Sequence, residues 1–297
     1  MKGQMKREQN IMEVSMRRVN GENFSSPARD TLAVEEPLEI RLGYESAEGG
    51  GRTHKSISIT MRTPGDDFEL ATGFLFTEGI IKSAAQIERL YHCGKARGAN
   101  DLRNVVRVEL KPEVTVDLKS LERHFYTSSS CGVCGKTSIE ALQVKRRSAA
   151  FGRDGLQFDA SVVHELPETL RPAQNVFNRT GGLHAAALFD AHGGLQMLRE
   201  DVGRHNAVDK LIGAFVLAGK VPLSDQLLMV SGRISFELVQ KALMGGISVL
   251  AAVGAPSSLS VELASQYQMT LIGFVREKRF NIYTGAWRIR EAGGEAP

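Results

Sequence analysis

Apolar and polar residues alternate twice in the first part of the chain, over residues 38–44 and over residues 57–61. This alternation is typical of strands that bury one face, and the glycines at 49–51 between the two stretches suit a turn. The sequence therefore predicts a β-hairpin. Apolar residues then recur at helical spacing over 68–75, which predicts a helix that ends near Gly79.

The second half of the chain alternates short apolar runs with segments of helical spacing, separated by turns that contain glycine. We expect an α/β sandwich with a mixed sheet, because a tight turn joins the first two strands and helices join the later ones. The predicted strands are 183–189, 195–198, 227–230, 247–252 and 271–274, and the predicted helices are 207–218, 236–244 and 259–267.

These patterns also predict the domain organisation. Residues 1–35 are mostly polar and show no sustained periodicity, so we expect a mobile leader there. A smaller lobe of strands and helix follows over 36–125, with further strands at 105–110 and 114–118. The remaining regions are a cysteine-bearing loop and helix over 126–146, an α/β ligand-binding domain over 147–290 and a tail over 291–297.

The composition excludes several classes of protein. Of the 297 residues 42% are hydrophobic and 24% are charged, as in ordinary globular proteins, and the formal charge of +3 is too small to predict a nucleic-acid partner. No apolar run approaches the roughly 20 residues that span a bilayer, and the N-terminus lacks the apolar core of a secretory signal. Three cysteines form no disulfide framework and fit a reducing compartment. We therefore expect a cytoplasmic protein that is not inserted in a membrane.

Two of the cysteines form a C-x-x-C pair, Cys131 and Cys134, in a small, polar and glycine-rich segment. Thr137 and Glu140 have the spacing of a capping box, so a helix is expected to begin directly after the pair. The positive end of that helix and the Lys136 ammonium would lower the pKa of a thiol and raise its reactive fraction at neutral pH. A thiolate beside a second thiol suits sulfur relay through a persulfide as well as disulfide exchange.

Three other interpretations of the cysteine pair compete with sulfur relay. A structural zinc site needs four ligands, and the pair supplies two, with His92 and Cys93 as distant candidates for the rest. A thioredoxin-like dithiol is the stronger alternative, although that motif normally lies early in a short fold. The surrounding serines and glycines disfavour an inert buried pair. We therefore predict Cys131 and Cys134 as the catalytic residues and expect no metal site.

Three predicted junctions between a strand and a helix collect polar and cationic side chains. Such junctions meet at one edge of an open α/β sheet, where ligands bind. Their glycines, hydroxyls and guanidinium groups suit phosphate, so together they predict a nucleotide-like ligand. The candidate residues are Asp201, Arg204, His205 and Asn206, with Asn206 as a helix cap, then Ser231 and Arg233, and the similar turn at 254–257.

Two further stretches are candidates for the same site. His184 is either a structural histidine or a residue that faces the site. Its surroundings are similar to the H-x-E motif of zinc deaminases. Ala186 stands where that motif has its carboxylate, so deaminase chemistry is not expected. The second stretch follows the last parallel strand and carries three cations. Alone it predicts a solvated turn, but at a carboxyl edge it could hold a diphosphate. Its residues are Phe274, Val275, Arg276, Glu277, Lys278 and Arg279.

With these segments in place, the sequence resembles the FdhD family of accessory proteins for formate dehydrogenase, over about residues 38–283. The resemblance implies a fold similar to cytidine deaminase, which is a three-layer sandwich. The stretches that carry it are Ser130-Cys-Gly-Val-Cys-Gly135, Thr180-Gly-Gly-Leu-His-Ala-Ala186, Asp201-Val-Gly-Arg-His-Asn206, Ser231-Gly-Arg233 and Gly254-Ala-Pro-Ser257, with support from Phe68-Glu-Leu-Ala-Thr-Gly-Phe74 and Thr77-Glu-Gly79.

The family's role, which the resemblance implies for this chain, is to receive sulfur from a cysteine desulfurase and to pass it to the bis(molybdopterin guanine dinucleotide) molybdenum cofactor. The resemblance assigns the persulfide to Cys131, the second thiol to Cys134 and cofactor contact to residues 274–279. Cysteine desulfurase and apo formate dehydrogenase are the implied partners, and a guanine nucleotide is expected as a fragment ligand. A homodimer is the usual expectation for a soluble enzyme. A dithiol oxidoreductase and a noncatalytic cofactor chaperone remain the alternatives.

Overall fold

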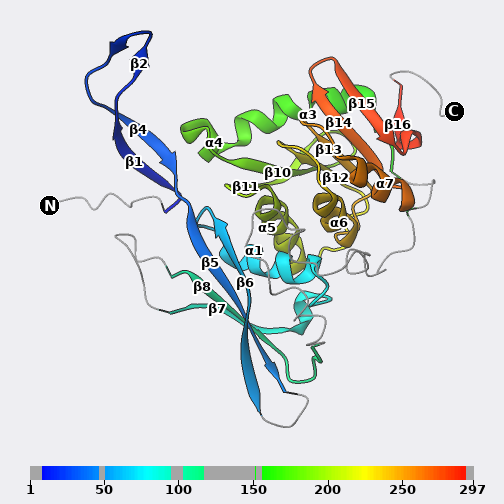
Figure 1. Ribbon diagram of the computed structural model, residues 1–297. Helices are drawn as coiled ribbons and strands as arrows, with labels where there is room; N and C mark the ends of the chain where they lie inside the picture. Colours follow the sequence, from blue (N-terminus) through cyan, green and yellow to red (C-terminus); the bar gives the residue numbers. More distant parts are fainter. Residues whose placement is uncertain (1–8, 47–50, 95–102, 117–150, 152–155, 292–297) are drawn as a thin grey trace.

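The computed structural model of the protein describes residues 9–46, 51–94, 103–116, 151 and 156–291 (Figure 1). The cysteine pair and the helix predicted after it lie outside these residues. The largest element is a mixed sheet in the order β11-β10-β12-β13-β14-β15, in which β12, β13 and β14 are parallel. Its strands are β10 (His184–Phe189), β11 (Leu195–Asp201), β12 (Leu227–Val230), β13 (Val249–Ala252), β14 (Thr270–Arg276) and β15 (Arg279–Thr284).

Helices cover both faces of this sheet (Figure 1). Val249 of β13 packs in the cluster that contains α3 (Ala160–Ala173), whereas its neighbour Leu250 packs in the cluster on the other face. Successive side chains of a strand point to opposite faces, so a strand covered on both sides is apolar throughout. The second cluster contains α5 (Arg204–Leu217), α6 (Phe236–Met244) and α7 (Ser258–Gln266). The predicted mixed α/β fold is confirmed, and its likeness to cytidine deaminase stays a prediction.

A second sheet of four strands, in the order β6-β5-β8-β7, shares the core of α5. β5 pairs antiparallel with β6, which confirms the predicted hairpin, and parallel with β8. The strands are β5 (Glu36–Glu45), β6 (Arg52–Arg62), β7 (Ile87–Cys93) and β8 (Val105–Leu110); α1 (Asp67–Thr77) follows β6, and the 3-10 helix η1 (Ala84–Gln86) precedes β7.

The packing of α1 against α5 joins the two sheets. Gly73 and Gly213 lie where the helices cross, and a Cβ on Gly73 would overlap the carbonyl oxygen of Asp209. Without side chains at these two positions, the helix backbones can touch. At the edge of the crossing, Arg199 Nε lies 2.6 Å from Glu69 Oε2. The stretch 68–74, which supports the family resemblance, thus contributes to helix packing.

Residues 1–35, which the sequence predicts as a mobile leader, contain regular strands in their described part. Two antiparallel pairs form within the described part of this segment: β1 (Ile11–Met16) with β4 (Ala28–Ala33), and β2 (Val19–Asn20) with β3 (Asn23–Phe24). Most of their side chains are exposed, and of the two longer strands only β1 alternates between apolar and polar residues, over the short stretch 12–16, so the sequence carries a weak signal for the arm. The pairs project from the body of the molecule as an arm (Figure 1).

Other elements also differ from the prediction. α3 and α4 (Asn175–Thr180) have no predicted counterpart, because Pro167 and Pro172 interrupt the helical pattern of α3. No strand forms over the described residues 111–116, although a strand was expected from 114 to 118. The short strands β9 (Phe158–Asp159) and β16 (Ile289–Arg290) pair in parallel. The 3-10 helix η4 (Ala286–Arg288) directly precedes β16. Among the residues described, no helix has the length and apolar character to cross a membrane.

Candidate functional site

One edge of the six-stranded sheet gathers most of the residues that the sequence singled out. β10 is antiparallel to both β11 and β12, so β11 ends at the same edge as β12, β13 and β14. His184, the first residue of β10, lies opposite Asp201, the last residue of β11. The structure therefore brings the junctions at 201–206, 231–233 and 254–257 together, as predicted, and places His184 among them.

The turns at this edge pack backbone against backbone. The amide of Gly254 donates to the carbonyl of Gly232 over 3.2 Å, and the amide of Phe274 donates to the carbonyl of Gly254 over 3.1 Å. A Cβ on Gly254 would lie 2.8 Å from the oxygen of Gly232, so a larger residue would push the turns apart. The His184 imidazole lies against Gly232 at the other end. The edge is thus a continuous row of turns from His184 to Phe274.

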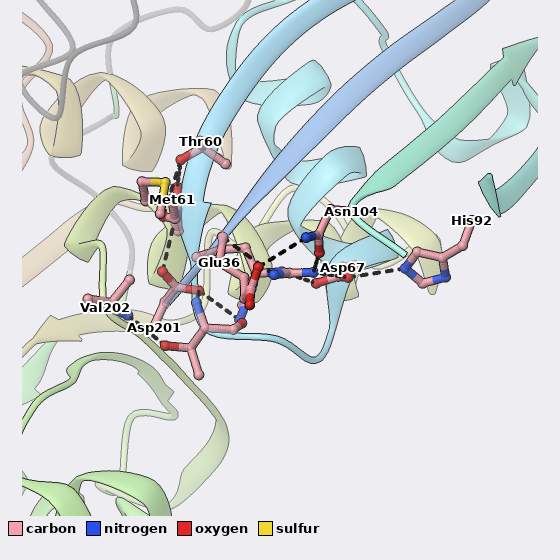
Figure 2. Close-up of polar contacts among 12 residues, drawn as sticks. Glu36, Thr60, Met61, Asp67, His92, Asn104, Asp201 and Val202 are labelled. Atoms are coloured by element: carbon pink, nitrogen blue, oxygen red, sulfur yellow. Dashed lines mark hydrogen bonds and ion pairs between the residues drawn. The ribbon is translucent and has the colours of Figure 1, made fainter. Parts of the chain in front are cut away.

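The Asp201 carboxylate is fully buried and bound within the protein (Figure 2). Lys210 Nζ lies 2.8 Å from Oδ2, which also accepts from the amide of Thr63 at 3.2 Å. Oδ1 accepts from the amide of Gly203 at 2.8 Å and from the side chain of Asn206 at 3.0 Å. With four donors engaged and no exposed surface, this carboxylate holds the junction between β11 and α5.

Asn206 is not the helix cap that the sequence predicts, because α5 already begins at Arg204. Its amide nitrogen also donates to the carbonyl of Met61 at 2.7 Å, and its amide oxygen accepts from the Thr60 hydroxyl at 3.1 Å. Thr60 and Met61 belong to β6 (Figure 2). Asn206 therefore ties the start of α5 to the four-stranded sheet.

The basic side chains of Arg204, His205 and His184 lie together in one part of the edge. The Nε of Arg204 is buried and has no hydrogen-bond partner in the described parts of the chain. Burial lowers the pKa of His184, and the charges of Arg204 and His205 lower it further, against the opposing charge of Asp201. An anion here would offset the repulsion among these groups and give Arg204 an acceptor. This part of the edge can therefore bind an anionic group.

Ser235 and Glu237, which the sequence analysis did not single out, lie beside His205 at the start of α6. Nε2 of His205 lies 3.1 Å from Ser235 Oγ and 3.7 Å from Glu237 Oε2. Burial raises the pKa of Glu237, but hydrogen bonds with His205, with its own backbone and with Ser235, and the charge of His205, outweigh burial and lower the pKa to about 2. Glu237 is therefore ionised at neutral pH and helps to hold the imidazole in place.

Because the pKa of Glu237 is low in the folded protein, the unfolding free energy changes with pH in the acid range. Its pKa rises from about 2 in the folded chain to about 4.5 in the unfolded chain, so its contribution is complete above about pH 4.5 and is lost as the pH falls toward about 2. We expect the difference in unfolding free energy between the unmodified protein and Glu237→Gln to shrink from about pH 5 to about pH 2.5. Urea denaturation at several pH values measures it, and a difference that stays constant would contradict the prediction.

The cationic stretch after β14 forms a tight hairpin at the far end of the edge. Arg276 and Arg279 pair across the turn, Glu277 and Lys278 form its tip, and all four side chains are exposed. The Nδ1 of His164, on α3, lies 3.5 Å from the carbonyl oxygen of Arg276. The hairpin therefore presents three cations at the carboxyl end of β14, where a ligand on the row of turns would meet them.

The remaining predicted contacts differ in accessibility. Val275 is buried in the cluster under α3, so its side chain faces the core. Phe274 is half-buried and has a φ of 56°, in the left-handed region that residues other than glycine rarely adopt. The Ser231 hydroxyl accepts from the amide of Ala185 at 2.9 Å, which links β10 to the next turn, and Arg233 is exposed.

Cys131 and Cys134 lie outside the described residues, so their position relative to this edge stays a prediction. Cys93 is a free, half-buried cysteine on β7. Next to it, Nε2 of His92 lies 3.1 Å from Oδ2 of Asp67, the first residue of α1. His92, a candidate zinc ligand in the sequence, therefore has a structural partner in the small lobe.

Comparison with known proteins identifies the family. The FdhD/NarQ family profile matches residues 33–290. The chain belongs to the FdhD/NarQ family. The FdhD/NarQ match begins at residue 33, the last residue of β4, so most of the N-terminal arm, β1 to β4, lies before it.

Relatives of this FdhD/NarQ protein share one name, sulfur carrier protein FdhD. Those from Streptomyces avermitilis, Mycobacterium tuberculosis and Saccharolobus solfataricus are 50%, 49% and 41% identical over 88% of this chain and over 89%, 92% and 91% of their own. A crystal structure of a candidate formate dehydrogenase accessory protein from Desulfotalea psychrophila matches with a TM-score of 0.70 at 22% identity, over 95% of this chain and 100% of that one. At this identity it shows the shared fold alone.

Four residues that shape the edge were not among the residues predicted from the sequence. Thr63 and Lys210 bind Asp201 from inside the protein, and Ser235 and Glu237 surround His205. Only Ser235 carries a local signal, since serine directly before an apolar helical pattern is a common helix N-cap. The others become visible only when distant parts of the chain are brought together.

Proposed function

We propose that this FdhD/NarQ protein accepts sulfur from a cysteine desulfurase on Cys131 and delivers it to the bis(molybdopterin guanine dinucleotide) molybdenum cofactor for formate dehydrogenase. The family and the name shared by its relatives confirm the predicted role as a sulfur carrier. In the loading step, the Cys131 thiolate attacks the outer sulfur of the desulfurase persulfide; a new S–S bond forms, and the desulfurase thiolate leaves. Cys134 acts as the second thiol.

The observation that supports the cofactor as substrate is the row of turns with cations at both of its ends. Guanine dinucleotide groups contain diphosphates, which are anions that accept hydrogen bonds. Arg204 offers a buried Nε without a partner among the described residues, and the 276–279 hairpin offers three exposed cations. Charge-assisted hydrogen bonds from guanidinium and ammonium groups are the strong contacts that phosphates make in proteins. The residues present therefore fit such a substrate.

The geometry divides the predicted cofactor residues into two groups. Residues with accessible side chains are proposed to touch the substrate, or a guanine nucleotide as its fragment. Asp201 and Asn206 are engaged in the interior and Val275 lies in the core, so we propose that these three shape the edge instead. The proposed contacts are His184, Arg204, His205, Ser231, Arg233, Phe274, Arg276, Glu277, Lys278 and Arg279.

We further propose that the protein works in the cytoplasm as a homodimer, with a cysteine desulfurase and apo formate dehydrogenase as partners. The sparse cysteines support a reducing compartment, because three cysteines form no disulfide framework. Symmetric dimers are the commonest assemblies of soluble proteins. Sedimentation at equilibrium tests the oligomeric state directly.

Removal of the hairpin cations is expected to separate sulfur loading from substrate retention. The triple variant Arg276→Ala, Lys278→Ala, Arg279→Ala should still accept sulfur on Cys131 but should retain the molybdenum cofactor at least about tenfold less well, because three charge-assisted contacts are lost. Intact mass after incubation with a desulfurase and cysteine measures loading. Fluorescence of the oxidised pterin measures retained cofactor.

A matched control removes three exposed cations elsewhere, as Arg17→Ala, Arg18→Ala, Lys220→Ala. It should load sulfur and retain cofactor like the unmodified protein. Equal retention by both triple variants would show that the hairpin is only a solvated turn. Failure of the unmodified protein to gain sulfur in the mass spectrum would instead contradict the persulfide itself.

A further inference from the structure

We propose that Thr63 is a positioning residue for the substrate edge, through which the four-stranded lobe sets the conformation of the Asp201–His205 segment. The inference rests on the proposed function, because it concerns the edge that is proposed to bind the cofactor. Thr63 follows β6 directly, and it belongs to the small lobe rather than to the sheet that carries the edge. Its polar contacts nevertheless lie on the other side, at the end of β11, in the turn that follows it and on α5.

Each polar group of Thr63 contacts a different residue: one at the end of β11, one in the following turn and one on α5. Its amide donates to Asp201 Oδ2 at 3.2 Å, its hydroxyl accepts from the amide of Val202 at 3.2 Å, and its carbonyl accepts from Lys210 Nζ at 2.9 Å. Only 3% of the Thr63 surface is exposed, so water does not compete for these contacts. One residue thus fixes the end of β11, the following turn and the inner face of α5.

Lys210 completes this arrangement. Its ammonium lies 2.8 Å from Asp201 Oδ2 and 3.4 Å from the carbonyl oxygen of Glu200, and it is almost fully buried. A buried ion pair of this kind is costly to disturb, because removal of one partner leaves the other charged and without solvent. Asp201, Lys210 and Thr63 are therefore expected to move as one unit.

The backbone at Thr63 is held by a second buried ion pair, which its neighbour Arg62 makes with Asp67. Arg62 is fully buried; its Nε lies 2.9 Å from Asp67 Oδ1 and its Nη2 donates to Asn104 Oδ1 at 3.2 Å. These contacts fix the end of β6 to the start of α1 and to the residue before β8 (Figure 2). The position of Thr63 is thus set by contacts of the small lobe as well as by its own contacts with the Asp201 junction.

The segment that Thr63 holds carries two of the proposed substrate contacts. Arg204 and His205 follow Val202 by two and three positions, and α5 begins at Arg204. The Arg204 side chain, whose buried Nε has no partner within the described residues, extends from this backbone, so its position follows that of the segment. A shift of that backbone would misplace both cations, and well-placed contacts lose affinity steeply when they move.

The test compares Thr63→Val, which removes only the hydroxyl, with Thr63→Ser, which keeps it. Thr63→Val is expected to weaken GDP binding, measured by calorimetry, roughly three- to tenfold, the usual effect of one hydrogen bond, and Thr63→Ser should restore it. Amide exchange at Val202 should accelerate in Thr63→Val and stay slow in Thr63→Ser. The matched control is Thr72→Val on α1, because the Thr72 hydroxyl is buried without a hydrogen-bond partner in the described structure.

Equal GDP affinity and equal exchange at Val202 in Thr63→Val and Thr72→Val would overturn the proposal. A loss of affinity that Thr63→Ser does not restore would also overturn it, because the hydroxyl would then not be the cause. If the unmodified protein binds no GDP, the guanine nucleotide part of the proposed function fails, and cofactor retention replaces GDP as the readout. Thr63→Val should then retain less cofactor while sulfur loading on Cys131 stays normal.

Discussion

Cells that carry Cys131→Ala are expected to lose nearly all formate dehydrogenase activity, while the level of the folded protein stays normal. The thiolate is the atom that receives sulfur in the proposed function, and alanine offers no nucleophile in its place. The surrounding serines and glycines indicate a thiol that contributes little to packing, so stability should change little. Formate-dependent dye reduction in cell extracts measures the activity, and immunoblotting measures the protein.

The third cysteine provides the control for this prediction. Cys93 lies half-buried on β7, so Cys93→Ala removes a thiol from the structure without touching the proposed sulfur path. Its effect on formate dehydrogenase activity should be small. Near-normal activity in Cys131→Ala would contradict the persulfide mechanism, and near-normal activity with both cysteines of the pair changed to serine would favour a cofactor chaperone. Cycling of a disulfide between Cys131 and Cys134 with a substrate thiol would favour an oxidoreductase.

Gly73→Ala is expected to destabilise the protein by more than about 3 kcal/mol, a large effect for the addition of one methyl group. The new Cβ would overlap the carbonyl oxygen of Asp209 on α5, and a backbone atom cannot rotate away as a side chain does. The helices would have to separate, which would open the core shared by the two sheets. Urea denaturation followed by circular dichroism measures the change in unfolding free energy.

Gly182→Ala is the matched control, because a Cβ there would meet its nearest neighbour, the Ala33 side chain, at an ordinary contact distance of 3.7 Å. Its denaturation midpoint should lie close to that of the unmodified protein. Equal midpoints for Gly73→Ala and Gly182→Ala would mean that α1 and α5 do not touch through their backbones. A folded Gly73→Ala protein with weakened cofactor retention would instead place the helix crossing in control of the substrate edge.

The α/β part of the fold could be predicted from the sequence because its strands are covered on both faces. β12 and β13 show this, since every residue of either strand is buried and each reads as an unbroken apolar run. The arm was not predicted for the opposite reason, because most of its side chains are exposed and the alternating stretch of β1, residues 12–16, is short. α3 was obscured by Pro167 and Pro172, which local propensity treats as breaks although the helix continues through them.

In the candidate site, too, some features follow from the local sequence pattern, whereas others depend on contacts between residues far apart in the chain. That the turns share an edge could be predicted, since the carboxyl ends of parallel strands coincide by topology. The inward orientation of Asp201 could not, because its partners Thr63 and Lys210 are set by packing between the two sheets. The polar side chains of Asp201 and Asn206 follow a strand, as ligand-binding residues often do, and this position makes them candidates in the sequence.

The contact between Thr63 and Asp201 also constrains the order of folding during synthesis. The two residues are 138 positions apart in the chain. At ordinary translation rates of about 5 to 20 residues per second, Thr63 leaves the ribosome roughly 7 to 28 s before Asp201. The small lobe can therefore form its hairpin and its Arg62 to Asp67 ion pair early, but the face that receives α5 stays uncovered during that interval. Nascent chains stalled before residue 200 should accordingly be protected from proteolysis less well than chains released after residue 220.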